Sequence, residues 1–155
     1  MKNINQQSYT RSQSLAFNHF LASRFVEDQS LNVVFRLKSA IVENATLINM
    51  NEQIATSIAR HFRNSLHQHL FGNRYRRFRH EIALTVALHT EPYFHLHAHI
   101  AADTNIMKLK IRCFCETFAI KNRFMIPFPH VAETQSEVAT EIYNARFGPD
   151  SVILF

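Results

Sequence analysis

The amino-acid sequence predicts an α+β fold in which a central antiparallel sheet carries two helices on one face. Two kinds of pattern support this: short runs that alternate apolar and polar residues, and longer runs in which apolar residues recur every three or four positions. After a first helix, these runs follow one another in the order β-α-β-β-α-β-α-β. That order is typical of a ferredoxin-like or RRM-like sheet, which is built around a split βαβ unit.

The first part of the chain contains two predicted helices with a strand between them. Residues 12–26 have apolar residues at helical spacing, and residues 32–38 alternate as a half-buried strand does. The clearest helix spans residues 51–72, because its apolar residues recur at successive fours and Gly72 can serve as its C-cap.

The second part of the chain supplies the remaining elements. In order, they are a strand at 80–89, a strand at 94–102, a helix at 103–118, an edge strand at 123–131, a helix at 135–148 and a strand at 150–155. The turn-like sequence TEPY joins the first two strands into a hairpin. Asp103 can cap the following helix, and Pro127 and Pro129 restrict their strand to a sheet edge.

Composition indicates one soluble domain. The chain has 155 residues, of which 46% are apolar, so it can bury a core, and we expect a single domain over 1–155 with 1–30 as an N-terminal helical extension. Two cysteines are too few for a disulfide framework, and no apolar run approaches the ~18 residues of a membrane span. We therefore expect a cytoplasmic protein without a membrane partner. The formal charge of +5 suits a polyanionic partner without identifying one.

The predicted hairpin collects histidines on one side. Its apolar residues fall on even positions in both strands, so both sets can face the core only if even residues pair with even residues. That pairing brings His89 onto the same face as His95, His97 and His99.

Clustered imidazoles of this kind can bind a metal ion. Histidines two apart on a strand lie about 6.6 Å apart at Cα, so one ion can take an adjacent pair, either His95 with His97 or His97 with His99. His89 lies nearer His95, which favours His89, His95 and His97 as the ligands, with Glu91 as a substitute third ligand. The alternative is a solvated histidine face without a metal.

Two motifs resemble those of the HUH endonucleases, particularly the rolling-circle replication initiators of plasmids and single-stranded DNA viruses. His95-Leu96-His97 matches the family's histidine-hydrophobic-histidine strand, and Tyr143 in IYNAR matches its tyrosine motif. Arg146 stands where the family has a lysine. The likeness covers roughly residues 32–155. It implies a tyrosine that becomes linked to a 5′ phosphate, Mn²⁺ or Mg²⁺ as the cofactor, and a tyrosine helix near the face of the sheet opposite the other helices.

Phosphodiester chemistry explains why these motifs occur together. A divalent ion on the phosphate oxygens polarises phosphorus and offsets the charge that builds up, and a tyrosine hydroxyl can then attack as phenolate. Arg146 lies on the same side of the helix as Tyr143, where it can grip a phosphate but cannot act as a base. The alternative for Tyr143 is a packing residue on an amphipathic helix. Imidazole ligands favour Mn²⁺ over Mg²⁺.

A basic stretch interleaved with aromatic residues follows the long helix. Such a mixture can track a phosphate backbone while its rings stack on bases, although a solvated loop has the same composition. We expect DNA contacts from this stretch and from His99; the basic residues are Arg74, Arg76, Arg77 and Arg79. The long helix also carries His61, His67 and His69, whose spacing predicts surface residues.

The sequence thus predicts metal-dependent, sequence-specific nicking and rejoining of single-stranded DNA through a covalent phosphotyrosine, initiating rolling-circle replication. A relaxase or a single-tyrosine transposase belongs to the same class. From other classes, the alternatives are a non-catalytic ferredoxin-like domain that binds nucleic acid and a metal-binding protein with no nucleic acid partner. No GxxxxGK[ST] segment occurs, so a separate helicase is the expected partner.

Overall fold

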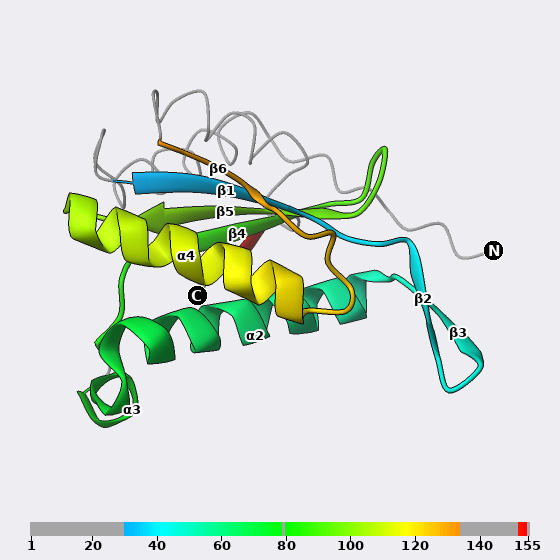
Figure 1. Ribbon diagram of the computed structural model, residues 1–155, viewed down its shortest axis with the longest axis horizontal. Helices are drawn as coiled ribbons and strands as arrows, with labels where there is room; N and C mark the ends of the chain where they lie inside the picture. The colour runs from blue at the N-terminus through cyan, green and yellow to red at the C-terminus, as the bar shows by residue number, and fades with distance from the viewer. Residues whose placement is uncertain (1–29, 79, 134–151, 155) are drawn as a thin grey trace, which may run out of the picture.

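The computed structural model describes residues 30–78, 80–133 and 152–154, and these form an α+β fold with an antiparallel sheet, as predicted (Figure 1). Its five strands lie in the order β6-β1-β5-β4-β7, and every neighbouring pair is antiparallel. Their bounds are β1 Ser30–Arg36, β4 Leu84–His89, β5 His95–Ala101, β6 His130–Glu133 and β7 Val152–Leu154. The helices predicted at 12–26 and 135–148 lie outside the described residues.

Two long helices cover one face of this sheet (Figure 1). Helix α2, Glu52–Phe71, begins where the side chain of Asn51 accepts a hydrogen bond from the Ile54 amide and ends at Gly72, whose φ of 55° favours glycine. Helix α4, Asn105–Lys121, is capped by Thr104, whose hydroxyl accepts a hydrogen bond from the Met107 amide. The predicted cap Asp103 was therefore one residue too early, and the helix runs three residues past its predicted end.

The core lies between the sheet and these helices. The alternation predicted for the first strand is confirmed, since Leu31, Val33 and Phe35 are buried on the helix side. Phe35 packs edge-on against Phe62 of α2 with ring centroids 4.9 Å apart. Even-numbered residues of β4 and β5 complete the layer: Leu84, Val86, Leu96, Ala98 and Ile100. The parity on which the histidine prediction rests is therefore correct.

The structure adds a hairpin and a short helix that the sequence patterns did not predict. Strands β2, Ala40–Glu43, and β3, Thr46–Asn49, form a separate two-stranded sheet that projects beyond the end of the main one (Figure 1). The turn between them uses Asn44 and Ala45 with positive φ, as a type I′ turn requires, but alanine rarely signals such a turn. Helix α3, Asn73–Phe78, occupies the basic stretch.

Strand β6 is shorter than predicted. It begins at His130, because Pro127 and Pro129 cannot donate to a ladder, and the preceding residues make only an isolated bridge between Leu37 and Met125. Likewise β4 begins at Leu84 rather than at residue 80. Among the described residues, no helix has the length and apolar character needed to cross a membrane.

Candidate functional site

The register of the sheet places the predicted histidines on the face opposite α2 and α4. His89 pairs directly with His95, while His97 pairs with Ala87 and His99 with Thr85. We call this surface the histidine face; it carries His89, His95, His97 and His99 together with the neighbouring outward residues of β1, β4 and β6. The predicted even-to-even pairing is confirmed.

Three of the four rings lie close together at the turn end of the hairpin. The ring centroids of His89 and His95 are 4.8 Å apart, those of His89 and His97 are 5.5 Å apart, and those of His95 and His97 are 6.0 Å apart. The rings of His89 and His97 are stacked at 7°, whereas His95 stands nearly perpendicular to both. The structure therefore brings together the three histidines named as candidate ligands.

The backbone fixes the orientation of His95. Its Nδ1 lies 2.8 Å from the Tyr93 carbonyl oxygen, which can only accept, so Nδ1 carries the hydrogen. In the neutral ring, Nε2 is then the nitrogen with the lone pair, and it accepts a hydrogen bond from Nδ1 of His89 at 3.2 Å. Metal-binding histidines are commonly oriented by such a bond from the other ring nitrogen to a carbonyl.

The separation of this nitrogen pair also matches two neighbouring positions around one metal ion, which would take the place of the hydrogen on His89 Nδ1. Ligands at about 2.1 Å from an ion lie roughly 3.0 to 3.4 Å from each other, and the His89–His95 separation of 3.2 Å falls in this range. Among the described residues, however, no group of three or more His, Cys, Asp or Glu side chains is arranged to hold a metal ion. The nitrogen pair at 3.2 Å belongs to opposed residues on two strands, not to the predicted HxH pair on one strand. Glu91 is exposed in the hairpin turn.

Burial keeps two imidazoles of the histidine face, His97 and His99, neutral. The side chains of His89, His95 and His99 are almost wholly buried. Burial, reinforced by the neighbouring imidazoles, lowers the pKa of His97 to about 4. Burial lowers the pKa of His99 to about 4 as well. Both rings are therefore uncharged at neutral pH, the state in which imidazole can donate a lone pair.

His99 occupies a different environment from the other three histidines. Its Nε2 lies 2.9 Å from the Ser30 hydroxyl, and its exposed fraction is 2%. Its burial is like that of His89, at 1%, and His95, at 6%, so only the bond to Ser30 sets it apart. The DNA contact that we expected of His99 stays a prediction.

Two further residues of the histidine face emerge only from the strand order. Arg36 of β1 pairs with His95, and His130 of β6 pairs with Val34, which itself pairs with His97. Both are exposed. No position of this face in the described strands carries a carboxylate, so its exposed charge suits an anion. The alternation of β1 could have placed Arg36 away from the core, but not next to His95.

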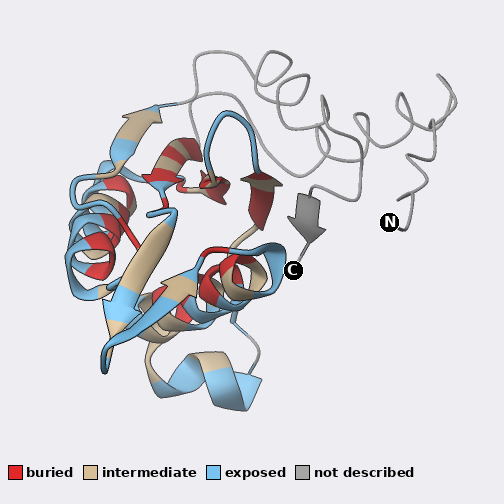
Figure 2. Ribbon diagram, turned by 90° about the vertical axis from the view of Figure 1, so that its right-hand side faces the viewer, coloured by how far each residue is buried: buried red, intermediate tan, exposed pale blue. Residues whose placement is uncertain are grey.

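The predicted DNA-binding arginines lie elsewhere. Arg74, Arg76 and Arg77 are exposed on α3, and Arg79 is outside the described residues. Figure 1 places α3 at one end of the molecule and the β4–β5 turn at the other, and Figure 2 shows that the short helix at its base carries no buried residue. The basic stretch is therefore an exposed surface remote from the histidine cluster.

Helix α3 is held by residues for which we expected other roles. The ring of Tyr75 stacks on His67 at 5.1 Å, and its hydroxyl donates to the Asn64 side chain at 3.0 Å. Tyr75 thus serves packing more than base stacking. The surface prediction for His67 was wrong: the ring is 1% exposed, accepts a hydrogen bond from the Ile82 amide, and has its pKa lowered by burial. His61 and His69 are exposed, as predicted.

The proposed nucleophile Tyr143 and its neighbour Arg146 both lie outside the described residues. Comparison with protein-family models, curated proteins and solved structures finds no match to this chain. The features of this protein that bear on its function are therefore the geometry of the histidine face and the sequence motifs.

Proposed function

We propose that this protein nicks and rejoins single-stranded DNA at specific sequences with a metal ion and a covalent phosphotyrosine, as HUH-type initiators of rolling-circle replication do. The observation that carries the proposal is the pair of nitrogens on His89 and His95, 3.2 Å apart, with the His97 ring beside them. On this proposal, the strand order β6-β1-β5-β4 is that of the ferredoxin-like split βαβ sheet, extended at one edge by β7.

On this proposal, the residues of the histidine face bind the metal ion and the phosphate. His89 and His95 would hold the ion, His95 being aimed by its bond to the Tyr93 carbonyl, and His97 would complete the set by rotating its ring toward them. A bound Mn²⁺ or Mg²⁺ would polarise the scissile phosphate. Arg36, opposite His95 and exposed, would bind a phosphate oxygen of the strand.

The reaction replaces one ester bond to phosphorus by another. The Tyr143 phenolate forms a bond to phosphorus, the bond from phosphorus to the 3′ oxygen breaks, and that oxygen leaves as a hydroxyl after taking a proton. Arg146, three residues after Tyr143, would contact the phosphate and not accept the proton. Attack by a 3′ hydroxyl reverses the steps and rejoins the strand.

Covalent capture tests this proposal. Labelled single-stranded oligonucleotides incubated with the protein and Mn²⁺ should give an adduct that survives a denaturing gel, and Tyr143→Phe should abolish it. Tyr93→Phe and Tyr75→Phe are matched controls that should retain it. His95→Ala should remove cleavage while leaving DNA affinity largely intact. Cleavage unaffected by either Tyr143→Phe or His95→Ala would refute the assignment of the site.

The exposed arginines of α3 favour a second candidate, a non-catalytic domain that binds nucleic acid. Such a domain would retard oligonucleotides on a native gel without cutting them at any Mn²⁺ concentration. Its affinity for oligonucleotides would fall when Arg74, Arg76 and Arg77 are replaced together by glutamine, and would not change with His95→Ala.

A further inference from the structure

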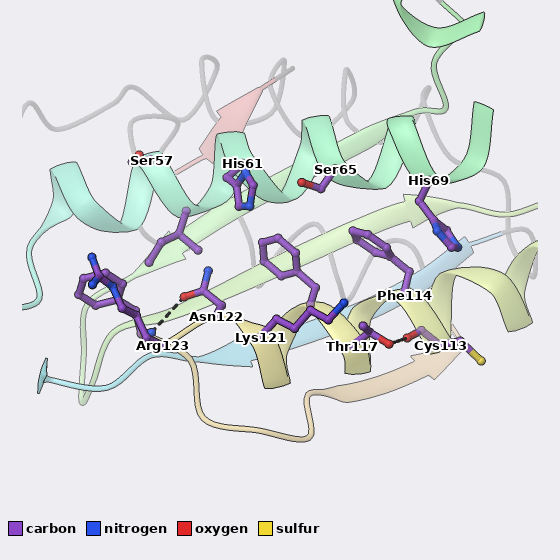
Figure 3. Close-up of a pocket in the computed structure, with 13 residues that line it drawn as sticks. Ser57, His61, Ser65, His69, Cys113, Phe114, Thr117, Lys121, Asn122 and Arg123 are labelled. Carbon is purple, nitrogen blue, oxygen red and sulfur yellow. Dashed lines mark hydrogen bonds between the residues drawn. The ribbon is translucent and has the colours of Figure 1, made fainter. Parts of the chain in front are cut away.

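An open groove of about 730 Å³ runs between α2 and α4, on the face of the molecule opposite the histidine face (Figure 3). Its α2 wall is a stripe of residues four apart: Ser57, His61, Ser65 and His69. Figure 3 shows His61 and His69 pointing toward α4, and Phe114 of α4 pointing toward α2. The two small serines leave the space that bulkier residues would have closed.

The groove combines an apolar lining with positive charge. Phe114, Phe118 and Phe124 supply aromatic surface, Lys121 reaches along the middle of the α4 wall, and Arg123 lies at one end. No residue that lines it carries a carboxylate. Arg123 also forms an ion pair with Glu43 of β2, which leaves Lys121 as the stronger source of positive potential. A matching ligand is therefore apolar along its length and anionic at its flank.

Helix α4 extends this apolar surface beyond the groove. Ile106, Leu109 and Ile120 are 71%, 62% and 58% exposed, and helical geometry puts them on the side of α4 next to Cys113. Three large exposed side chains on one side of one helix are more than the scattered apolar residues expected on a surface. The exposed apolar surface thus extends from Ile106 to Ile120, over nearly the whole of the 17-residue helix α4.

We infer that the groove and the adjoining side of α4 bind an amphipathic helix of a partner protein, with apolar anchors on one face and acidic residues beside them. A helix is the occupant that matches a long, straight, mostly apolar channel, and its anchors would recur at i, i+4 and i+7. Single-stranded nucleic acid fits less well, because Lys121 and Arg123 are the only lysine or arginine among the described residues that line the groove, and Arg123 is already paired with Glu43. The inference does not depend on the proposed function.

Fluorescence anisotropy with defined probes tests the inference on the full chain. The probe is a labelled 17-residue helical peptide with Leu and Phe anchors flanked by glutamates; one control replaces glutamate by lysine and another replaces the anchors by serine. We expect the acidic probe to bind and the two control peptides not to bind. Ser65→Trp, which fills the groove, should weaken it about tenfold or more, and Lys121→Glu should weaken it about fivefold. Lys38→Glu, the same charge change at an exposed position outside the groove, should leave it unchanged.

Several results would overturn the inference. The lysine probe could bind as tightly as the acidic probe, or the Ser65→Trp variant could bind the acidic probe as tightly as the native sequence does. Oligo-dT could displace the peptide, or light scattering could show a self-association that Ser65→Trp abolishes. The last two would identify nucleic acid or a second copy of the chain as the occupant. Circular dichroism checks that Ser65→Trp folds; if it does not, Leu109→Asp on the exposed side of α4 serves in its place, with the same expected loss.

Discussion

Acidification should destabilise this protein through the buried imidazoles of the histidine face. Burial lowers the pKa of His97 and of His99 from 6.5 to about 4 in the folded protein. The unfolded chain therefore binds more protons than the folded one between these values, and stability falls as the pH drops through this window. The contribution is fully present about one unit above pH 6.5, and its loss is complete about one unit below pH 4.

The size of the effect follows from the two pKa values. Each histidine with this shift lowers the free energy of unfolding by about 2 kcal/mol between pH 7.5 and pH 5, so the pair lowers it by roughly 4 kcal/mol when the two titrate independently. That is a large part of the roughly 5 to 15 kcal/mol that stabilises a typical domain. The melting temperature should therefore fall by roughly 5 to 15 °C over this range.

Urea unfolding of chelator-treated protein at pH 7.5 and pH 5 measures this loss. The double variant His97→Gln/His99→Gln carries no titrating group at these positions and should lose most of the pH dependence. A matched variant, His61→Gln/His69→Gln, changes two exposed histidines and should keep it. Equal stability of the native sequence at both pH values, or an unaltered slope in the buried double variant, would refute the reasoning.

Three further outcomes are expected. Mn²⁺ at a hundredfold excess over its dissociation constant should add about 2.7 kcal/mol to the stability seen in calorimetry, and His95→Ala should eliminate this gain. Iodoacetamide should modify exposed Cys113 in the native protein but reach Cys115, whose burial raises its thiol pKa, only after unfolding, as peptide mass spectrometry can show. Phe62→Ala should cost about 3 to 5 kcal/mol in urea unfolding because its ring lies at the centre of the core. Phe78→Ala, at a 68% exposed ring, should change stability by less than about 0.5 kcal/mol.

Periodicity predicted the parts of the fold where burial is one-sided. The first strand, the hairpin and the helix now seen as α2 each bury one face, so their apolar residues repeat at the period of the element. The β2–β3 hairpin escaped this reasoning because both its faces carry apolar residues. Its Ile41–Ile48 pair is half-buried, whereas its Val42–Leu47 pair is exposed. Without an apolar and a polar side there is no alternation to detect.

At the candidate site, sequence patterns predict which histidines share a face but not which ring nitrogens meet. Strand parity identified which histidines share a face, because that depends only on the pleat. Cross-strand register then decides which rings meet, and the direct pairing of His89 with His95 brings their ring centroids to 4.8 Å, against 6.0 Å for the two histidines of the HxH motif. Neither parity nor register sets the rotation of a side chain. The His97 ring stacks on the His89 ring, and the His95 ring is oriented by its hydrogen bond to the Tyr93 carbonyl. A sequence motif can therefore nominate ligands, but the bonds that orient each ring determine which nitrogens converge, and here they select a pair that spans two strands.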